Sequence, residues 1–346
     1  MAKIIKAPNI KDVAKEANVS VSTVSSVINN SRFVKKEKMD RVGNAIKKLN
    51  YKVNPIARGL RTRKVNAVGV ILPDIADPYF AQVIKGMEKV AKERNYTLVL
   101  GCSFYNILEE ERQIELFLSH YIDGIIFFCG LDSYSHIKKV FNAGVSVVVV
   151  DREIKDKKIP SVLIDNTLAM EQAIDYLCNF GHRNIGYLTF SFENQTTIRK
   201  RYEGYIRAHK KHNLTVKNDL VLVSDSIKLN ELEGTYNLVK NSFNKKNIPT
   251  AFATVSDLVA VSLISVLTEM GYEIPKDISI IGFNNENICK FSIPSLTSVK
   301  QPKKEMGEQA MQLLLDAIEG KKNINKNLIL STQIIERNSV AKPRKY

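Results

Sequence analysis

The chain has 346 residues and a net charge of +15 at pH 7. Residues 1–64 hold sixteen Lys and Arg against four Asp and Glu, a net of +12, so the other 282 residues are close to neutral at +3. A basic segment joined to a near-neutral body is typical of a nucleic-acid-binding head on a globular domain, although a disordered, membrane-binding or RNA-binding tail has the same charge. No apolar run approaches the ~18–20 residues of a membrane span, and the N-terminus lacks the apolar segment of a secretory signal, so we expect a cytoplasmic protein.

The beginning of the chain contains periodic apolar positions, which a disordered basic arm lacks. Asn9 is a candidate N-cap for a first helix, the pair Asn18-Val19 interrupts that helix, and Ser20 is a candidate N-cap for a second. A third amphipathic stretch follows over 38–50. The predicted inward faces consist of Val13, Ala14 and Ala17, then Val24, Val27 and Ile28, then Val42, Ala45, Ile46 and Leu49. Two short helices joined by a tight turn and supported by a third predict a helix-turn-helix domain over 1–53.

The outward face of the second helix is predicted to comprise Val21, Ser22, Ser25 and Ser26, near its N-terminus. Such a helix enters the major groove of DNA with its N-terminal residues against base edges. Serine can pair with several bases and Val21 can contact a thymine methyl group, but this face has no Arg or Gln that could read a base through two hydrogen bonds. We therefore expect modest base readout from this helix. The alternative is an ordinary helical bundle with a solvated serine-rich face.

The segment over 54–64 has the residues of a helix that needs a partner to form. Asn54 is a candidate N-cap and Pro55 suits the first helical position, but only about two turns can follow, and helices this short are marginal in water. Gly59 costs roughly a further 0.5–1 kcal/mol against Ala. Leu60 lies among arginines with no apolar core nearby, which suits a wedge in the minor groove. The alternative is a basic flexible linker whose leucine packs on the body.

Residues 65–346 alternate apolar strand-like runs with amphipathic helical stripes. Short apolar strands separated by helices predict an α/β fold, with parallel sheets covered by helices on both faces. Nine or more strands over about 280 residues exceed one ordinary domain, so we expect two lobes. The strand-like runs cover 67–72, 97–102, 124–129, 145–150, 161–164, 185–188, 220–223, 251–254 and 278–283.

Polar and aromatic side chains follow several of these strands. In sheets of this kind, ligands bind outside the carboxyl ends of the strands. The residues there include Asp74, Asp77, Tyr79, Phe80, Asp151, Arg152, Ser256, Asp257, Asn284 and Asn285. Polar groups and aromatic rings that converge on one edge are typical of a site for a sugar or polyol. For each single residue, a role in a turn or a helix cap is the alternative.

Signatures of other chemistry are absent from the sequence. It has no GxGxxG or GxxxxGK[ST] motif for nucleotides and no GxSxG motif for a nucleophilic serine. The four cysteines show no CxxC pairing, and the spacing of His209 and His212 brings no third ligand with it. We therefore expect no metal site, no cofactor and no enzymatic activity.

The chain resembles the LacI/GalR family of bacterial transcription regulators. The resemblance rests on IKDVAKEANVSVSTVSSVINN (10–30), NYKVNPIARGL (50–60), VGVILPDIADPYF (68–80), DGIIFF (123–128), GHRNI (181–185) and SLTSVKQP (295–302), which occur in the family's order. It implies a homodimer that reads a pseudo-palindromic operator in double-stranded DNA, with hinge helices paired across the dyad. The DNA contacts that it implies are Ala57, Leu60 and Arg61 in the minor groove, Val21, Ser22 and Ser26 at bases, and Thr23, Ser25, Asn29 and Arg32 at the backbone or in docking, and Ser20 belongs to the same candidate set. The chain departs from the family at Lys38-Met39, where Thr-Arg is usual, so a phosphate contact there is in doubt.

For the body, the resemblance implies a two-lobed core of the periplasmic-binding-protein type I fold, with an effector in the cleft between the lobes. Family effector positions coincide with or adjoin Tyr79, Phe80, Asp151, Arg152, Arg201 and Asp257, and we add Asp77 from the strand-end pattern. Asn284 stands where the family commonly has Asp, and Ser226 stands where it often has an aromatic residue. These departures weaken the case for an ordinary neutral sugar. With Arg152, Arg201 and the nearby Arg199 and Lys200, an anionic ligand becomes an alternative, so we expect a sugar or a sugar phosphate as the effector.

The sequence thus predicts three parts: the head (1–53), a hinge (54–64) and an effector-binding and dimerisation core (65–346). We expect the first lobe to include about 65–163 and 296–325, and the second about 164–295 and 326–342. The predicted function is a ligand-responsive transcriptional repressor of carbohydrate-utilisation genes. The alternatives are a global catabolite regulator with a phosphorylated protein as corepressor, a sugar-binding or sugar-modifying enzyme fused to a DNA-binding head, and a DNA binder without sequence preference.

Overall fold

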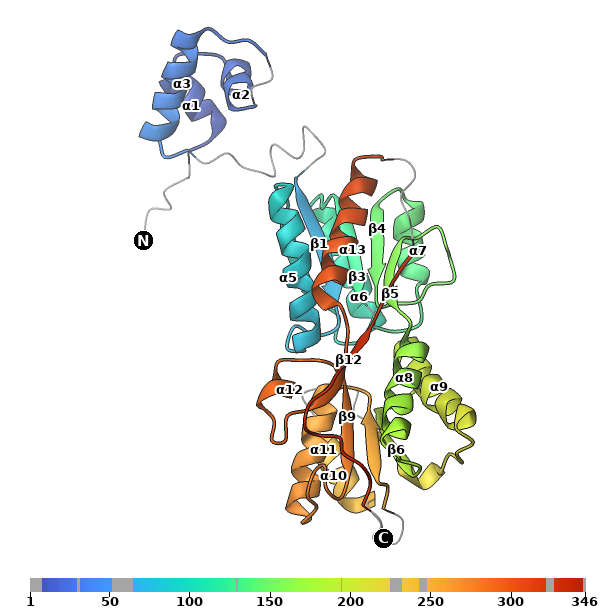
Figure 1. Ribbon diagram of the computed structural model, residues 1–346. Helices are drawn as coiled ribbons and strands as arrows, with labels where there is room; N and C mark the ends of the chain where they lie inside the picture. Colours follow the sequence, from blue (N-terminus) through green and yellow to red (C-terminus); the bar gives the residue numbers. More distant parts are fainter. Residues whose placement is uncertain are drawn as a thin grey trace, which may run out of the picture. The chain divides into compact units, whose positions relative to one another are not determined.

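The computed structural model describes residues 8–29, 32–51, 65–128, 130–193, 195–224, 232–242, 248–321 and 327–344. The chain forms two compact units, Met1–Val65 and Asn66–Tyr346 (Figure 1). We describe each unit by itself. Within the described residues, no helix combines the length and the apolar character needed to cross a membrane.

Among the described residues, the first unit contains the three predicted helices, α1 (Ile10–Glu16), α2 (Val21–Asn29) and α3 (Lys36–Lys48). Asn9 caps α1 as expected: its Oδ1 accepts from the backbone N–H of Lys11 at 2.8 Å, while the Asp12 carboxylate accepts from the N–H of Asn9 at 2.8 Å. The core is small and is made of Val13, Ala14, Ala17, Val24, Val42 and Ala45. Packing of these residues, rather than helix propensity, holds three short helices together.

The second unit contains two six-stranded sheets. The first sheet has the strand order β11-β5-β4-β3-β1-β2 and the second has the order β12-β10-β9-β8-β6-β7. All pairings are parallel except that of β12 with β10. The first sheet consists of β1 (Ala67–Leu72), β2 (Thr97–Cys102), β3 (Gly124–Phe128), β4 (Ser146–Val150), β5 (Ser161–Ile164) and β11 (Asn327–Leu330). The second consists of β6 (Ile185–Phe190), β7 (Val221–Ser224), β8 (Ala251–Thr254), β9 (Ser279–Asn284), β10 (Thr297–Lys300) and β12 (Gln333–Ile335).

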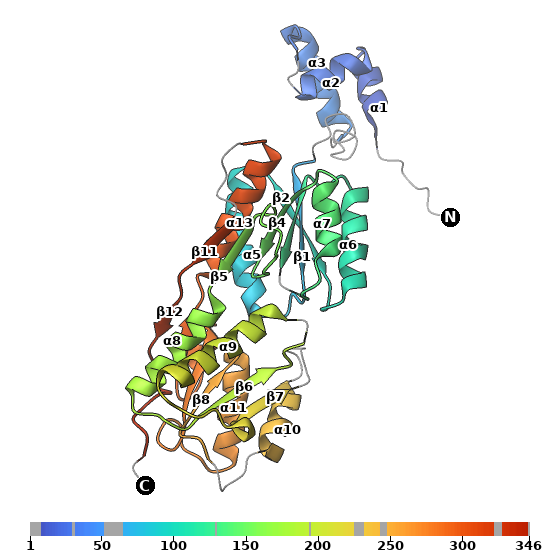
Figure 2. The ribbon, with the colours of Figure 1, turned by 90° about the vertical axis from the view of Figure 1, so that its right-hand side faces the viewer.

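Helices cover both faces of each sheet, which confirms the predicted α/β architecture (Figure 2). The first sheet has α5 (Pro78–Glu93) and α13 (Lys303–Ile318) on one face and α6 (Ile107–Ser119) and α7 (Ser135–Asn142) on the other. The second sheet has α8 (Asn166–Asn179) and α9 (Thr196–Lys211) on one face and α10 (Leu232–Ser242) and α11 (Asp257–Glu269) on the other. Two short elements, the 3-10 helix η1 (Asn218–Leu220) and α12 (Ile288–Phe291), complete the second lobe.

The chain crosses between the two lobes three times, and two of these crossings differ from expectation. We expected 296–325 in the first lobe and 326–342 in the second. Instead, β10 pairs with β9 in the second sheet, with Thr297 opposite Ile281, and β11 pairs with β5 in the first, with Asn327 opposite Ser161. Each of these two short strands therefore belongs to the sheet opposite to the one we assigned. The crossings therefore follow β5, β10 and β11.

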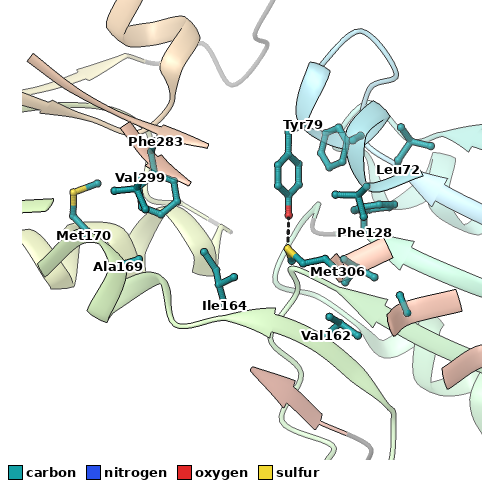
Figure 3. Close-up of a cluster of buried hydrophobic side chains, with 14 of the residues drawn as sticks. Leu72, Tyr79, Phe128, Val162, Ile164, Ala169, Met170, Phe283, Val299 and Met306 are labelled. Carbon is teal, nitrogen blue, oxygen red and sulfur yellow. Dashed lines mark hydrogen bonds between the residues drawn. The ribbon is translucent and has the colours of Figure 1, made fainter. Parts of the chain in front are cut away.

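The buried core is continuous across the two lobes. Tyr79 lies at the junction, with Leu72 and Phe128 of the first lobe on one side and Phe283 and Val299 of the second on the other (Figure 3). The Tyr79 hydroxyl donates to Met306 Sδ at 3.8 Å.

Within the first lobe, two glycines let α5 and α13 touch. A Cβ on Gly86 would lie 2.0 Å from the carbonyl oxygen of Lys304, and a Cβ on Gly307 would lie 1.9 Å from that of Val83. Such distances are possible only if the helix backbones move apart, so glycine is required at both positions.

We expect Gly307→Ala to destabilise the core, because overpacking against a backbone atom costs about 1–3 kcal/mol, which exceeds the ~1 kcal/mol that Ala adds to a helix. Gly43→Ala in α3 is the control: nothing lies within 4 Å of its added Cβ, so it should raise the stability of the head. Urea unfolding followed by circular dichroism measures both. A Gly307→Ala variant as stable as wild type would contradict the close helix packing.

Candidate functional site

The candidate DNA-reading face lies at the N-terminal end of α2. Ser20 caps the helix, since its Oγ accepts from the backbone N–H of Thr23 at 3.2 Å and lies 2.9 Å from Thr23 Oγ1. Val21 is 41% exposed and Ser22 is exposed beside it, as predicted. The Ser22 hydroxyl lies 2.8 Å from Ser20 Oγ.

Ser26 departs from the predicted outward face. It is only 6% exposed and its hydroxyl donates to the carbonyl oxygen of Ser22 at 2.8 Å. A serine that bonds the preceding turn of its own helix points along the helix and not toward a ligand. Ser25 is half-buried.

The other residues predicted to contact DNA differ in exposure, and some lie outside the described part of the chain. Arg32 is exposed, and Thr23 is half-buried beneath the cap. The backbone of Asn29 ends α2, but its side chain lies outside the described part of the chain. The hinge prediction, with Ala57, Leu60 and Arg61, also lies outside the described residues.

A candidate ligand pocket lies within the second unit, at the carboxyl ends of strands from both sheets. Its volume is about 80 Å³. Six of the predicted effector residues line it, namely Asp77, Tyr79, Phe80, Asp151, Arg201 and Asn284. The residues that the sequence did not single out are Tyr105, Gly130, Phe190, Gln195, Thr197, Ile198, Val255 and Gln301, together with Ser256 from the strand-end list. Ser226 lies outside the described residues.

Arg201 is the cation of this pocket. Its side chain is held by three contacts: Nε donates to Asn166 Oδ1 at 2.8 Å, Nη1 donates to the carbonyl oxygen of Val255 at 2.7 Å, and the guanidinium lies 3.9 Å from the centre of the Phe283 ring. Within the described residues, no carboxylate forms an ion pair with it. The guanidinium is therefore fixed in place with its charge available to a ligand.

Arg152, by contrast, does not line the pocket. It is 3% exposed, and Nη1 donates to the Glu110 carboxylate at 3.1 and 3.3 Å, while Nη2 donates to the carbonyl oxygen of Ser133. His136 Nε2 lies 2.5 Å from the same carboxylate. Burying a charge requires a partner of opposite charge, and Glu110, on α6, supplies it. The sequence placed Arg152 at the strand end correctly but could not show that its side chain turns inward.

Asp257 is also outside the pocket lining. It is fully buried, and its carboxylate accepts from the N–H of Glu286 at 2.6 Å and from Ser298 Oγ at 2.5 Å. Burial raises the pKa of Asp257 to about 6. These bonds tie down the segment after β9, which carries Asn284 into the pocket. Lys303 holds the same segment, since its Nζ donates to the carbonyl oxygen of Asn284 at 2.8 Å.

Three amide side chains supply neutral polar groups to the pocket. Asn284 Oδ1 accepts from Gln301 Nε2 at 2.8 Å. Gln301 Oε1 and Gln195 Nε2 are both buried and have no hydrogen-bond partner among the described residues. An unpaired buried polar atom costs about 1–3 kcal/mol, so these two atoms are candidate ligand contacts. Gln301 directly follows β10 in the KQP sequence, a position that could have been read as a strand end.

Other cations near the pocket are neutralised by carboxylates. Arg199 Nη2 donates to Asp132 Oδ2 at 2.9 Å, and Lys200 Nζ lies 2.7 Å from Glu153 Oε2. With Arg152 bound to Glu110, every cation that we had invoked for an anionic ligand except Arg201 has its own acidic partner. The structure thus removes most of the reason to expect an anionic effector.

Asp77 caps α5 at the edge of the pocket, and its Oδ1 accepts from the N–H of Tyr79 at 2.8 Å. Burial raises its pKa from 3.8 to about 6, against the lowering effect of that hydrogen bond. A raised pKa means that the folded state favours the protonated carboxyl. Its contribution to stability is full below pH 3.8 and is lost as the pH rises through about 6.

We therefore expect Asp77→Asn, which keeps the capping oxygen, to change how stability depends on pH. Between about pH 4.5 and about pH 7.5, wild type should lose about 2 kcal/mol of unfolding free energy relative to the variant. Urea unfolding of both proteins at the two pH values measures this. Asp156→Asn is the control. The Lys158 N–H lowers the pKa of Asp156, so the contribution of Asp156 to the unfolding free energy changes with pH in the opposite direction. Parallel pH curves for wild type and Asp77→Asn would contradict the raised pKa.

Comparisons with known proteins agree with this architecture. A family model described as "Bacterial regulatory proteins, lacI family" matches residues 9–54, and one described as "Periplasmic binding protein-like domain" matches residues 174–340. The HTH-type transcriptional repressor PurR of Salmonella newport (strain SL254) is 32% identical over 342 residues, covering 96% of this chain and 96% of that protein.

Solved structures share the fold over nearly the whole chain. A transcriptional regulator CelR–cellobiose complex has a TM-score of 0.71 at 26% identity, covering 96% of this chain and 99% of that one. A lac repressor dimer bound to operator and the anti-inducer ONPF has a TM-score of 0.84 at 21% identity, covering 97% and 100%. The family resemblance and the fold predicted from the sequence are confirmed. The chain belongs to the LacI family of bacterial regulatory proteins and is a ligand-responsive, DNA-binding transcriptional repressor.

Proposed function

We propose that this repressor acts in the cytoplasm as a homodimer on a pseudo-palindromic operator and that its effector binds in the pocket between the two lobes. The observation that carries the proposal is the pocket itself, in which Arg201 is fixed and two buried amide atoms lack partners, within a chain that also has a helix-turn-helix head. A ligand that changes the angle between the lobes would move the beginning of β1, where the head is attached.

Exposed apolar side chains on both lobes support the homodimer. In the first lobe, β2 is an edge strand with Val99 38% and Leu100 43% exposed. In the second lobe, Phe291 is 77% and Ile293 is 89% exposed. An unpaired edge strand with apolar side chains is a surface that proteins usually cover, and a second copy of the chain would do so.

For DNA, we propose that Val21 and Ser22 contact base edges in the major groove and that Leu60 acts as a wedge in the minor groove. The exposed position of the first two at the start of α2 supports the first part. The second part rests on the sequence of the hinge alone.

We expect Leu60→Ala to weaken binding to an operator selected from random duplexes by more than tenfold, over ~1.4 kcal/mol, because the wedge acts only on DNA that is bent at the correct centre. Binding to a scrambled duplex should hardly change. Lys64→Ala is the matched control: the loss of a phosphate contact should weaken both duplexes equally. Fluorescence anisotropy at fixed salt measures both. Equal loss on both duplexes for Leu60→Ala would reject the wedge.

For the effector, we propose an uncharged sugar or polyol rather than a sugar phosphate. The local neutralisation of Arg152, Arg199 and Lys200 supports this choice, as do the amide groups of Gln195, Asn284 and Gln301. The related CelR structure is a complex with cellobiose, a neutral sugar. The regulated genes would then be those of carbohydrate utilisation.

A thermal-shift screen with pairs of ligands that differ only in a phosphate group tests this choice. The pairs are glucose with glucose 6-phosphate and ribose with ribose 5-phosphate, and cellobiose is tested alone. At 100 times its dissociation constant, a ligand adds about 2.7 kcal/mol to the stability of the folded state. We expect a neutral member to stabilise the protein, the shift to be lost in Gln195→Ala, and the shift to be retained in Lys138→Ala, which changes an exposed residue of the first lobe.

Stabilisation by a phosphorylated member alone would overturn the neutral ligand. A blank screen with intact operator binding would favour the protein-corepressor alternative. Chemical conversion of a bound sugar, measured by chromatography of the ligand after incubation with the protein, would support the alternative of a fused enzyme.

A further inference from the structure

Asp132 of the first lobe makes an unusual set of contacts with the second lobe. It lies between β3 and α7, and its carboxylate accepts from the backbone N–H of Thr196 at 2.7 Å, from Thr196 Oγ1 at 2.5 Å and from Arg199 Nη2 at 2.9 Å. Thr196 and Arg199 form the first turn of α9. The contacts therefore join the two lobes, in addition to the buried core that both lobes share and the three crossings of the chain.

These contacts replace a cap that α9 does not supply for itself. A helix begins with N–H groups that lack partners in the helix, and the preceding side chain usually accepts from one of them. Gln195 precedes α9 and makes no such bond. Asp132 does so from the other lobe, and its negative charge also suits the positive end of the helix dipole. The first turn of α9 is thus completed only when the lobes are together.

Residues beside these contacts line the ligand pocket. Gly130, two residues before Asp132, lines the pocket from the first lobe, and Gln195 and Thr197, on either side of Thr196, line it from the second. The Gln195 amide, with its unpartnered Nε2, is therefore positioned directly by the bond that Asp132 makes to the next residue.

Water can reach the contact between Asp132 and Arg199. It is largely excluded from the other contact between the lobes, which Lys303 makes with Glu286 at the start of α13. The side chains of Asp132 and Arg199 are 32% and 42% exposed, whereas those of Lys303 and Glu286, which pair at 2.6 Å, are 10% and 5% exposed. Breaking a pair that water can solvate leaves no buried charge without a partner. The Asp132 contacts can thus open and re-form while the Lys303 contact stays closed.

We propose that Asp132 is the latch of the ligand pocket: it holds the lobes closed by capping α9, and its release opens the cleft for the effector. Asp132 is a positioning residue, acting through Gln195 and Thr197, and does not itself line the pocket. The pocket volume of about 80 Å³ is below the ~300–1,000 Å³ of ordinary ligand sites, so an opening step is needed for entry. The Lys200–Glu153 pair, 2.7 Å long and also exposed, lies beside the latch and joins the same two lobes.

The proposal rests on the proposed function only in assuming that this pocket binds a ligand. The test uses the full chain without ligand, so the latch and the assignment of the effector can be contradicted independently. Spin-labelled residues incorporated at the exposed positions Lys157, in the first lobe, and Lys210, in the second, report the distance between the lobes by pulsed electron resonance. Hydrogen exchange of the Thr196 amide reports the cap.

We expect Asp132→Ala to speed exchange of the Thr196 amide more than tenfold and to shift the label distance to a broader, more open distribution. Asp132→Asn, which keeps an acceptor for Thr196 but loses the charge opposite Arg199, should lie between Asp132→Ala and wild type. Asp132→Ala combined with Lys200→Ala should open the lobes furthest. Asp156→Ala is the matched control, because Asp156 pairs with Lys138 inside the first lobe and should leave both readouts unchanged.

An unchanged label distance in Asp132→Ala with faster exchange at Thr196 would overturn the latch, since Asp132 would then be only a helix cap. Unchanged values of both would overturn the cap as well. If Asp132→Ala fails to fold, the Asp132→Asn variant decides by the same two readouts. If these measurements support the latch but no sugar binds in the thermal-shift screen, the assignment of the effector is wrong and the latch still holds.

Discussion

Two parallel sheets hold the carboxyl ends of their strands against one cavity, and the ligand chemistry of this repressor depends on that arrangement. Strands that pair in parallel have their carboxyl ends on the same side of a sheet, and helices return the chain to the other side between them. Because the chain crosses between the sheets three times, the two sets of strand ends are brought together. Side chains far apart in the sequence, such as Asp77 and Asn284, therefore meet in one pocket.

The same arrangement determines how the charges are distributed. Strand ends place ionisable groups close to a dry interface, where each charge needs a partner or must become neutral. Arg152 takes Glu110 as its partner, while Asp77 and Asp257 have raised pKa values because burial disfavours their ionised forms. Arg201 is the exception, since it is held by an amide, a carbonyl and an aromatic ring. The pocket therefore combines one cation that has no acidic partner among the described residues with neutral amides and the carboxyls of Asp77 and Asp151.

Periodicity and capping signals predicted most of the fold, because they reflect local physics. The head helices and the strands β1–β9 lie where apolar repeats and caps indicated them. The short strands β10–β12 were missed: they have three or four residues each and are defined by their pairing with strands distant in the sequence. For that reason the lobe assignments of 297–300 and 327–330 were reversed.

Site residues were predictable to the extent that position alone decides their role. Being at a strand end correctly indicated Asp77, Asp151 and Asn284 as pocket residues. It could not reveal which way a side chain turns, and Arg152, Asp257 and Ser26 all turn toward partners within the fold. Gln195 was missed because it follows no strand directly and reaches the pocket through the start of a helix that is capped from the other lobe.

The strength of the cap that Asp132 provides to α9 determines how easily an effector can open the lobes. A helix cap contributes about 0.5–2 kcal/mol and an exposed ion pair about 0–1 kcal/mol. A latch of about 2 kcal/mol shifts the equilibrium between open and closed lobes toward the closed state by roughly 30-fold. An effector then needs only a modest difference in affinity between the two states to change which one dominates. A much stronger junction, such as several fully buried ion pairs, would hold the lobes closed against any small ligand, and the exposed position of Asp132 and Arg199 avoids that outcome.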